Sequence, residues 1–377
     1  MSAEARDAIP SLDGVRALAV SVVFLAHTGL DGWVPGGLGV TIFFVLSGYL
    51  ITTLLRAEHD RTGAIRLRAF YLRRALRLMP PMLIVVVAAG LLSLSGAIGG
   101  GFTPAGLASV LLYFANYHLV AENFGGVPDG LGVFWSLAVE EHYYLLYPPL
   151  LLLLLRLDHR RFTALVLAGL CLAILAWRCW LFAHGSGDAL DRHLAMATDT
   201  RVDAILVGCL MGLFANPWLD RGARTPSSPG LLGARDLGIA LLGVGVLLGT
   251  LAWRDEAFRA TVRYTVQSLA IAPLLWLAVA RADALPFRWL NAAPVAWLGR
   301  VSYTIYLSHQ AVLFALESRA PALGWLLTTL LGAAITLVIA AAMHRFVEAP
   351  CAEWRRRLHR TSRAAPTPAP VAAARAA

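Results

Sequence analysis

Lysine is absent from the 377 residues, so all 32 fixed basic charges are arginines. A coding bias accounts for this, and we assign it no function. Charged residues are also scarce, at 15% of the chain. The four cysteines show neither the CxxC spacing nor nearby histidines at ligand spacing, which argues against a disulfide framework and against a metal site.

Hydrophobic residues make up 58% of the chain, and the mean hydropathy is +0.66. This composition excludes an ordinary soluble domain. Apolar stretches long enough to cross a hydrocarbon layer of about 30 Å recur from residue 12 to residue 343. We therefore predict an all-α, polytopic protein whose main partner is the lipid bilayer. The net charge of +9 lies in arginines between these stretches, so we expect no nucleic-acid partner.

The placement of the arginines predicts the topology. We expect ten membrane-spanning helices near residues 12–29, 36–55, 79–99, 133–155, 163–183, 197–216, 236–253, 264–281, 293–314 and 322–345. With a cytoplasmic N-terminus, the arginine-bearing connections at 56–77, 156–161, 221–235, 281–288 and 355–363 all lie inside, as the positive-inside rule requires. Both termini are then cytoplasmic, and the expected location is the inner (cytoplasmic) membrane.

The segment 104–119 is apolar but short. We interpret it as re-entrant or interfacial on the outer side, the alternative being an eleventh span that inverts the later topology. The predicted domains are a cytoplasmic N-terminus at 1–11, a membrane domain at 12–348 and a basic, largely disordered cytoplasmic tail at 349–377. The oligomeric state is left open.

Ionisable side chains inside spans indicate function, because each costs roughly 2.5–3.5 kcal/mol on insertion. The first span contains Arg16 and His27, about 16 Å apart along one helix face. The fourth span contains adjacent Glu140 and Glu141, which point about 100° apart, so at most one is expected to face the cavity of Ser136. The topology places Glu140 in the same outer half as His27.

An arginine cluster precedes the third span, where Arg73 and Arg77 share a helix face beside Arg74. The cluster is either a topology anchor or a site for the phosphates of a cytoplasmic cofactor. Small residues in the second span allow either close helix packing or a ligand groove. The predicted donor-binding residues are Arg16, Ser47, Gly48, Arg73, Arg74 and Arg77.

The sixth span opens with Asp199, Arg201 and Asp203, and we expect Arg201 to pair with one of the two aspartates beside a cavity. The ninth span carries Tyr303 and His309, and an interior histidine is more often a packing residue than a catalytic one. The predicted acceptor or cavity-lining residues are Trp135, Ser136, Asp199, Arg201, Asp203, Tyr303 and His309.

Five motifs, in order over roughly residues 9–355, resemble those of acyltransferase family 3, the membrane O-acyltransferases that modify surface polysaccharides and macrolides. They are Leu12-Asp13-Gly14-Val15-Arg16 with His27 after ten intervening residues; Phe43-Phe44-Val45-Leu46-Ser47-Gly48-Tyr49-Leu50-Ile51; Arg73-Arg74-x-x-Arg77-x-x-Pro80; Trp135-Ser136-Leu137-x-x-Glu140; and Tyr303-x-x-Tyr306-Leu307-x-His309.

The resemblance implies transfer of an acyl group from cytoplasmic acyl-CoA, typically acetyl-CoA, to a hydroxyl of a sugar-containing acceptor, with no permanently bound cofactor. It also implies that His27 is essential and that Arg73, Arg74 and Arg77 hold the donor.

For this reaction a hydroxyl acceptor needs a base within reach, and a neutral imidazole suits that role. We therefore predict His27 as the general base, with Glu140 as the group that orients it or stabilises the imidazolium. A covalent acyl intermediate on His27 or Ser136 is left open.

Many family members carry an appended hydrolase-like domain, which we do not expect in this chain. The main alternative is a proton-coupled transporter or exporter of a small solute, because intramembrane ionisable groups also build proton relays.

Overall fold

The computed structural model describes residues 9–30, 32–156, 160–220 and 230–354. In these ranges the regular structure is helical, apart from two isolated β-bridges, which confirms the all-α prediction for that part of the chain. The helices are α2 (Leu12–Leu25), η1 (Ala26–Leu30), α3 (Gly36–Thr62), α4 (Leu67–Leu94), α5 (Pro104–Leu111), α6 (Ala115–Ala121), α7 (Phe134–Arg156), α8 (Arg160–His184), α9 (Asp188–Met196), α10 (Thr198–Arg201), α11 (Asp203–Phe214), α12 (Ala234–Ala252), α13 (Glu256–Ala260), α14 (Val262–Ala280), η2 (Arg288–Asn291), α15 (Ala293–Arg300), α16 (Ser302–Arg319), α17 (Trp325–Met343) and η3 (His344–Glu348).

Within the described residues, seven helical segments are long and apolar enough to cross a membrane. They are Leu12–Leu30, Gly36–Thr62, Leu67–Leu94, Arg161–His184, Ala234–Ala252, Val262–Ala280 and Trp325–Trp354. The other three predicted spans fall on α7, which carries two adjacent carboxylates, on the 12-residue α11 and on the polar α16. The chain is therefore a multi-pass membrane protein, while ten spans and cytoplasmic termini stay predictions.

Two predicted spans are interrupted. The sixth breaks at Val202 between α10 and α11, and the ninth breaks at Val301 between α15 and α16. In the ninth, α15 turns aside to pack on the start of α2, where a Cβ atom at Gly299 would lie only 1.7 Å from the carbonyl oxygen of Asp13. A single hydropathy window cannot separate two short apolar helices that meet at an angle.

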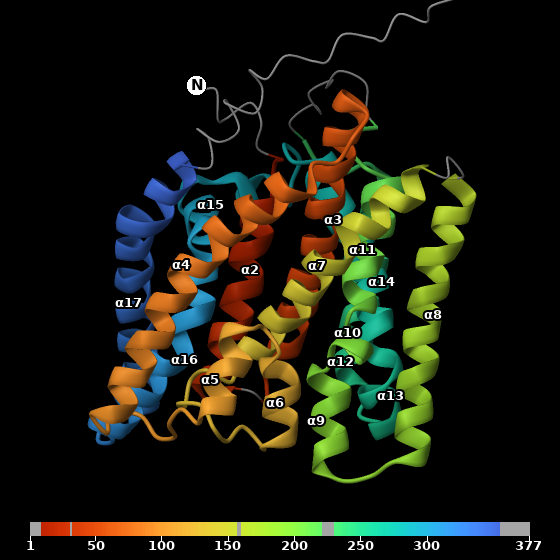
Figure 1. Ribbon diagram of the computed structural model, residues 1–377. Helices are drawn as coiled ribbons and strands as arrows, with labels where there is room; N and C mark the ends of the chain where they lie inside the picture. The colour runs from red at the N-terminus through yellow and green to blue at the C-terminus, as the bar shows by residue number, and fades with distance from the viewer. Residues whose placement is uncertain (1–8, 31, 157–159, 221–229, 355–377) are drawn as a thin grey trace, which may run out of the picture.

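The molecule has two distinct ends (Figure 1). The connection from α3 to α4 lies at the same end as α15, and the short helices α5, α6, α9 and α13 lie at the opposite end. We call these the α15 end and the α5 end. Helices α5 and α6 have eight and seven residues. At 1.5 Å per residue, neither is long enough to cross a bilayer alone. Whether the segment 104–119 is re-entrant or interfacial stays a prediction.

Helix α3 packs closely against α11 through glycines. A Cβ atom at Gly48 would lie 1.9 Å from the carbonyl oxygen of Ile205, and one at Gly208 would lie 2.0 Å from that of Val45. Small residues permit such backbone contact between membrane helices. Gly48 therefore serves helix packing, while its assignment as a donor-binding residue stays a prediction.

We expect Gly48→Ala to lower the apparent melting temperature of the detergent-purified protein, followed by tryptophan fluorescence, because overpacking costs about 1–3 kcal/mol. Gly245→Ala is the matched control in α12, since no atom lies within 4 Å of its Cβ position and alanine is the better helix former. A melting temperature unchanged by Gly48→Ala would favour the donor-groove interpretation.

Candidate active site

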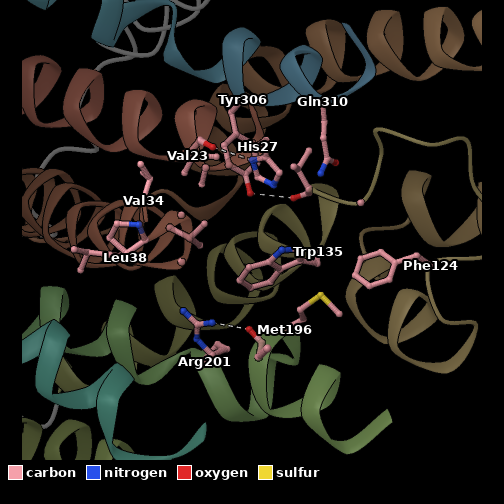
Figure 2. A pocket seen from close by; sticks show the side chains of 18 of the residues that line it. Val23, His27, Val34, Leu38, Phe124, Trp135, Met196, Arg201, Tyr306 and Gln310 are labelled. Carbon is pink, nitrogen blue, oxygen red and sulfur yellow. Dashed lines mark hydrogen bonds between the residues drawn. The ribbon is translucent and has the colours of Figure 1, made fainter. Parts of the chain in front are cut away.

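Two cavities lie side by side in the bundle. The His27 cavity has a volume of about 630 Å³, and its lining includes His27, Trp135 and Arg201 (Figure 2). The Glu140 pocket has a volume of about 90 Å³ and is lined by residues that include Arg16, Arg74, Arg77, Ser47 and Glu140. Val40 and Tyr306 line both cavities, so these two side chains form the wall that the cavities share.

His27 lies where the first helix ends. Helix α2 continues into a π-turn over Ala26–Leu30, in which Thr28 and Gly29 leave the helical conformation. Gly29 has a φ of 82°, which glycine adopts without a steric penalty. Such π-turns occur frequently at functional sites. The half-buried His27 ring is held at this turn and borders the cavity.

A second histidine supports the first. His309 is fully buried, and its Nε2 lies 3.2 Å from Nδ1 of His27. The other nitrogen of His309, Nδ1, lies 3.0 Å from the carbonyl oxygen of Ile305 and 2.8 Å from that of Tyr306. Nδ1 of His27 also contacts the carbonyl oxygen of Val23 at 2.9 Å. The backbone carbonyls therefore anchor both rings.

These contacts assign the tautomers of the neutral rings. Carbonyl oxygens only accept hydrogen bonds, so Nδ1 of His309 carries the hydrogen and its Nε2 is the acceptor. Nδ1 of His27 then donates, toward His309 and the carbonyl of Val23. The lone pair of the His27 ring consequently lies on Nε2, which is the form that a general base requires.

Glu140 lies in the neighbouring pocket. Its carboxylate accepts hydrogen bonds from Ser47 at 3.0 Å and from Tyr144 at 2.8 Å. Trp135 at the start of α7 borders the His27 cavity, and Glu140 is five residues, about 7.5 Å, further along that helix. The prediction that Glu140 orients His27 is therefore corrected, because the side chain at Nδ1 of His27 is His309.

The arginines of the Glu140 pocket come from two helices. Arg16 on α2 pairs with Asp13 at 3.1 Å, and the guanidinium of Arg74 on α4 lies 4.6 Å from the ring centre of Tyr144. Arg77 is the third. Arg73 does not line this pocket and pairs with Glu58 at 3.4 Å. The three predicted arginines are nevertheless neighbours, because Arg73, Arg74 and Arg77 together line a further pocket of about 130 Å³ with Glu58.

The wall between the cavities is polar at one point. The hydroxyl groups of Tyr306 and Ser136 lie 2.6 Å apart, and the Tyr306 hydroxyl also contacts the carbonyl oxygen of Val133 at 3.1 Å.

Ser136 faces the Glu140 pocket together with both Glu140 and Glu141. The expectation that at most one of the two carboxylates shares the cavity of Ser136 is therefore wrong, because a narrow pocket between helices admits flexible side chains from both positions.

The seven predicted acceptor or cavity-lining residues lie in different parts of the structure. Trp135 and Arg201 line the His27 cavity, Ser136 and Tyr303 line the Glu140 pocket, and His309 lies behind His27. Asp199 accepts hydrogen bonds from Trp177 at 2.8 Å and Tyr117 at 3.0 Å and pairs with His193 at 2.9 Å. Asp199 therefore connects α6, α8 and α9 through these side-chain contacts.

The predicted ion pair of Arg201 with Asp199 or Asp203 is wrong. Asp203 is fully buried and binds Arg178, itself fully buried, at 2.7 Å. Arg201 instead donates to the carbonyl oxygen of Ala195 at 2.6 Å and lies 3.9 Å from the ring centre of Tyr264. Tertiary packing brings α8 against α11, which places Arg178 closer to Asp203 than the sequence neighbour Arg201 is.

Comparison with known proteins assigns the family. Residues 9–345 match the sequence model of a family described as an acyltransferase domain. The chain belongs to this acyltransferase family. The resemblance seen in the five motifs is thereby confirmed.

Similar curated proteins are O-acetyltransferases by name. The acyltransferase chain is 29% identical to the peptidoglycan O-acetyltransferase OatA of Listeria monocytogenes over 92% of its own length and 56% of that protein. It is 29% identical to the O-acetyltransferase OatA of Staphylococcus aureus over 91% of its length and 57% of that protein. The chain thus spans somewhat more than half the length of the curated relatives it matches. No solved structure matches it.

Several polar residues in the two cavities and in the surrounding helices were missed in the sequence. Arg178 lies inside the apolar run of α8, so the filter for ionisable groups within spans would have found it. Tyr144 and Gln310, by contrast, gave no signal, because neutral polar residues are common in membrane helices. Arg259 and Arg263 sit in a connection that the topology assigned to the outside, where basic residues carry no topological meaning.

We expect Asp203→Asn to destabilise the acyltransferase strongly, because breaking a buried ion pair costs about 3–5 kcal/mol and leaves Arg178 without its counter-charge. Asp199→Asn is the control, since the Asp199 side chain is 36% exposed and its ion pair is expected to contribute about 0–1 kcal/mol. Urea titration of the two variants in the same detergent measures this, and equal midpoint shifts would contradict the Arg178 to Asp203 pairing.

Proposed function

We propose that the protein transfers an acetyl group from cytoplasmic acetyl-CoA to a hydroxyl of a sugar-containing acceptor, with His27 as the general base. The relatives named O-acetyltransferases support the acetyl group, and the one named for peptidoglycan supports a glycan acceptor. The α15 end, which bears the arginines at the end of α3 and the start of α4, faces the cytoplasm, and the α5 end faces outward.

One observation carries the proposal, namely the two cavities along one helix with a single shared wall. Arg16 borders the Glu140 pocket and His27 borders the other cavity. Eleven residues of helix place them about 16 Å apart along the axis. An extended pantetheine arm bridges much of this distance, so phosphates held at Arg16, Arg74 and Arg77 leave the thioester near the wall of Val40 and Tyr306.

The transfer step follows from the histidine pair. The acceptor hydroxyl oxygen attacks the thioester carbonyl carbon, and Nε2 of His27 takes the hydroxyl proton. The carbon–sulfur bond then breaks, and the imidazolium returns the proton to the departing CoA thiolate. The products are the acetyl ester and CoA, so atoms and charge balance. His309 acts as a positioning residue, since its Nε2 accepts from Nδ1 of His27 and stabilises the imidazolium.

The transporter alternative gains no support from the family match. A transporter would move its solute across the membrane without an acyl donor. Solute uptake into liposomes that contain the protein, measured without acetyl-CoA, tests this alternative.

We expect His27→Ala to reduce acetyl transfer about 10²- to 10⁴-fold, the range that general base catalysis contributes. Membranes of expressing cells are incubated with labelled acetyl-CoA, and label in the saccharide fraction is counted. Donor binding should persist in the variant. His184→Ala on the exposed end of α8 is the control. Unchanged transfer by His27→Ala would remove His27 from the mechanism.

We expect Arg77→Gln to raise the KM for acetyl-CoA about tenfold or more, because a hydrogen bond to a charged group contributes about 1.5–3 kcal/mol. Arg68→Gln is the matched control on the same helix, since Arg68 is exposed and lines neither the Glu140 pocket nor the pocket shared by Arg73, Arg74 and Arg77. An unchanged KM in Arg77→Gln would favour the topology-anchor interpretation of the cluster.

A further inference from the structure

The His27 cavity has a strongly cationic lining. Four arginines line it: Arg201, Arg254, Arg259 and Arg263, which we call the arginine wall. Across the described lining, Asp129 is the one carboxylate. No member of the wall forms an ion pair within 4.0 Å with a carboxylate of the described residues. Arg254 and Arg259 are exposed to solvent, so the unpaired charges that burial makes costly are those of Arg201 and the half-buried Arg263.

Arg201 shows this most clearly. It is only 2% exposed, and its Nε atom is buried without a hydrogen-bond partner. Its other contacts are the carbonyl oxygen of Ala195, the hydroxyl of Thr41 at 3.3 Å and the rings of Tyr264, Trp135 and Phe44, whose centres lie 3.9, 5.4 and 5.7 Å away. Arg178 is equally buried and its Nε also lacks a partner, but it has a carboxylate at 2.7 Å. A buried guanidinium without a counter-charge is unfavourable, so Arg201 lacks an anion that Arg178 has.

Two further buried atoms of this lining lack partners. They are Nε of Arg263, a donor, and Oε1 of Gln310, an acceptor. Arg263 lies on α14 next to Tyr264, whereas Gln310 lies on α16 next to His309. Donors for an anion therefore gather on one side of the cavity, and an acceptor suited to a hydroxyl lies near the histidine pair.

The geometry gives the anion and the reacting hydroxyl separate places. In Figure 2, Arg201 and His27 lie on opposite sides of Trp135, and Gln310 lies on the His27 side. A volume of about 630 Å³ falls within the range of small-molecule sites, about 300–1,000 Å³. One ligand can thus reach both sides of the cavity at once. Guanidinium groups bind phosphate and carboxylate oxygens with matched geometry.

We infer that the arginine wall binds an anionic group, a phosphate or a carboxylate, on the sugar that presents its hydroxyl to His27. This inference rests on the proposed function, because it names the class of acceptor that the same cavity takes. The sugar is then held by its anion on the Arg201 side while Gln310 accepts a hydrogen bond from one of its hydroxyl groups. A neutral sugar of the same size lacks the first of these contacts.

The test is equilibrium binding of three labelled sugars to the full chain in detergent, without any acyl donor. N-acetylglucosamine is the neutral probe, N-acetylglucosamine 1-phosphate carries a phosphate, and N-acetylmuramic acid carries a carboxylate. We expect at least one anionic sugar to bind roughly tenfold or more tightly than the neutral one, since hydrogen bonds to charged groups are the stronger ones. The tighter of the two anionic probes identifies the group.

Variants locate the effect. Arg263→Gln and Arg259→Gln should each remove most of the preference for the anionic sugar and leave binding of the neutral sugar unchanged. Arg319→Gln removes the same charge from an exposed position outside the cavity lining and should retain the preference. Equal binding of all three sugars, no binding of any, or a preference that survives both wall variants would overturn the inference.

The assay also separates this inference from the proposed function. Binding is measured without donor, whereas acetyl transfer is measured afterwards by adding acetyl-CoA. Anion-selective binding without transfer would support anion binding by the arginine wall and refute the acetyltransferase mechanism. Transfer to the neutral sugar without anion selectivity would support the mechanism and refute anion binding by the arginine wall.

Discussion

The close packing of α3 against α11 is the contact on which both cavities depend. Gly48 and Gly208 let the two backbones touch, so α3 is held in the middle of the bundle. Along α3, Val40 then lines the shared wall, Thr41 contacts Arg201, and Ser47, almost two turns further on, donates to Glu140. A shift of this helix would therefore disturb the wall, the cationic side of one cavity and the carboxylate of the other together.

The buried polar groups fall into two kinds according to whether the protein itself satisfies them. Arg178 and Asp203 neutralise each other, and Glu140 receives two hydroxyl hydrogen bonds. His309 is anchored on backbone carbonyls. These groups hold helices in place at little net electrostatic cost. Arg178 and Arg201 each have a buried Nε without a hydrogen-bond partner, but of the two Arg178 alone has a carboxylate of the described residues in ion-pair contact. Arg201 lies beside a cavity without such a counter-charge, which indicates a ligand rather than a structural role.

The division of the site into two cavities gives the proposed reaction its direction. One helical segment carries both Arg16 and His27. Arg16 lines the Glu140 pocket, and His27 lines the other cavity. Between them, Tyr306 and Ser136 close the wall with a hydrogen bond. In the proposed reaction, a donor and an acceptor that approach from opposite sides would meet at this wall and stay apart until transfer.

Hydropathy and the cost of burying charge were enough, from the sequence alone, to determine the helical membrane architecture and to single out His27, Arg16, Arg74 and Glu140. Those properties are local, since each depends on a residue and its own helix. Which polar groups touch each other was decided by tertiary structure. His309 rather than Glu140 meets His27, and Arg178 rather than Arg201 meets Asp203. Such contacts depend on the tilt and register of each helix against its neighbours. Glycine packing between distant segments sets the tilt and the register, so the spacing of residues within one helix does not encode the contacts.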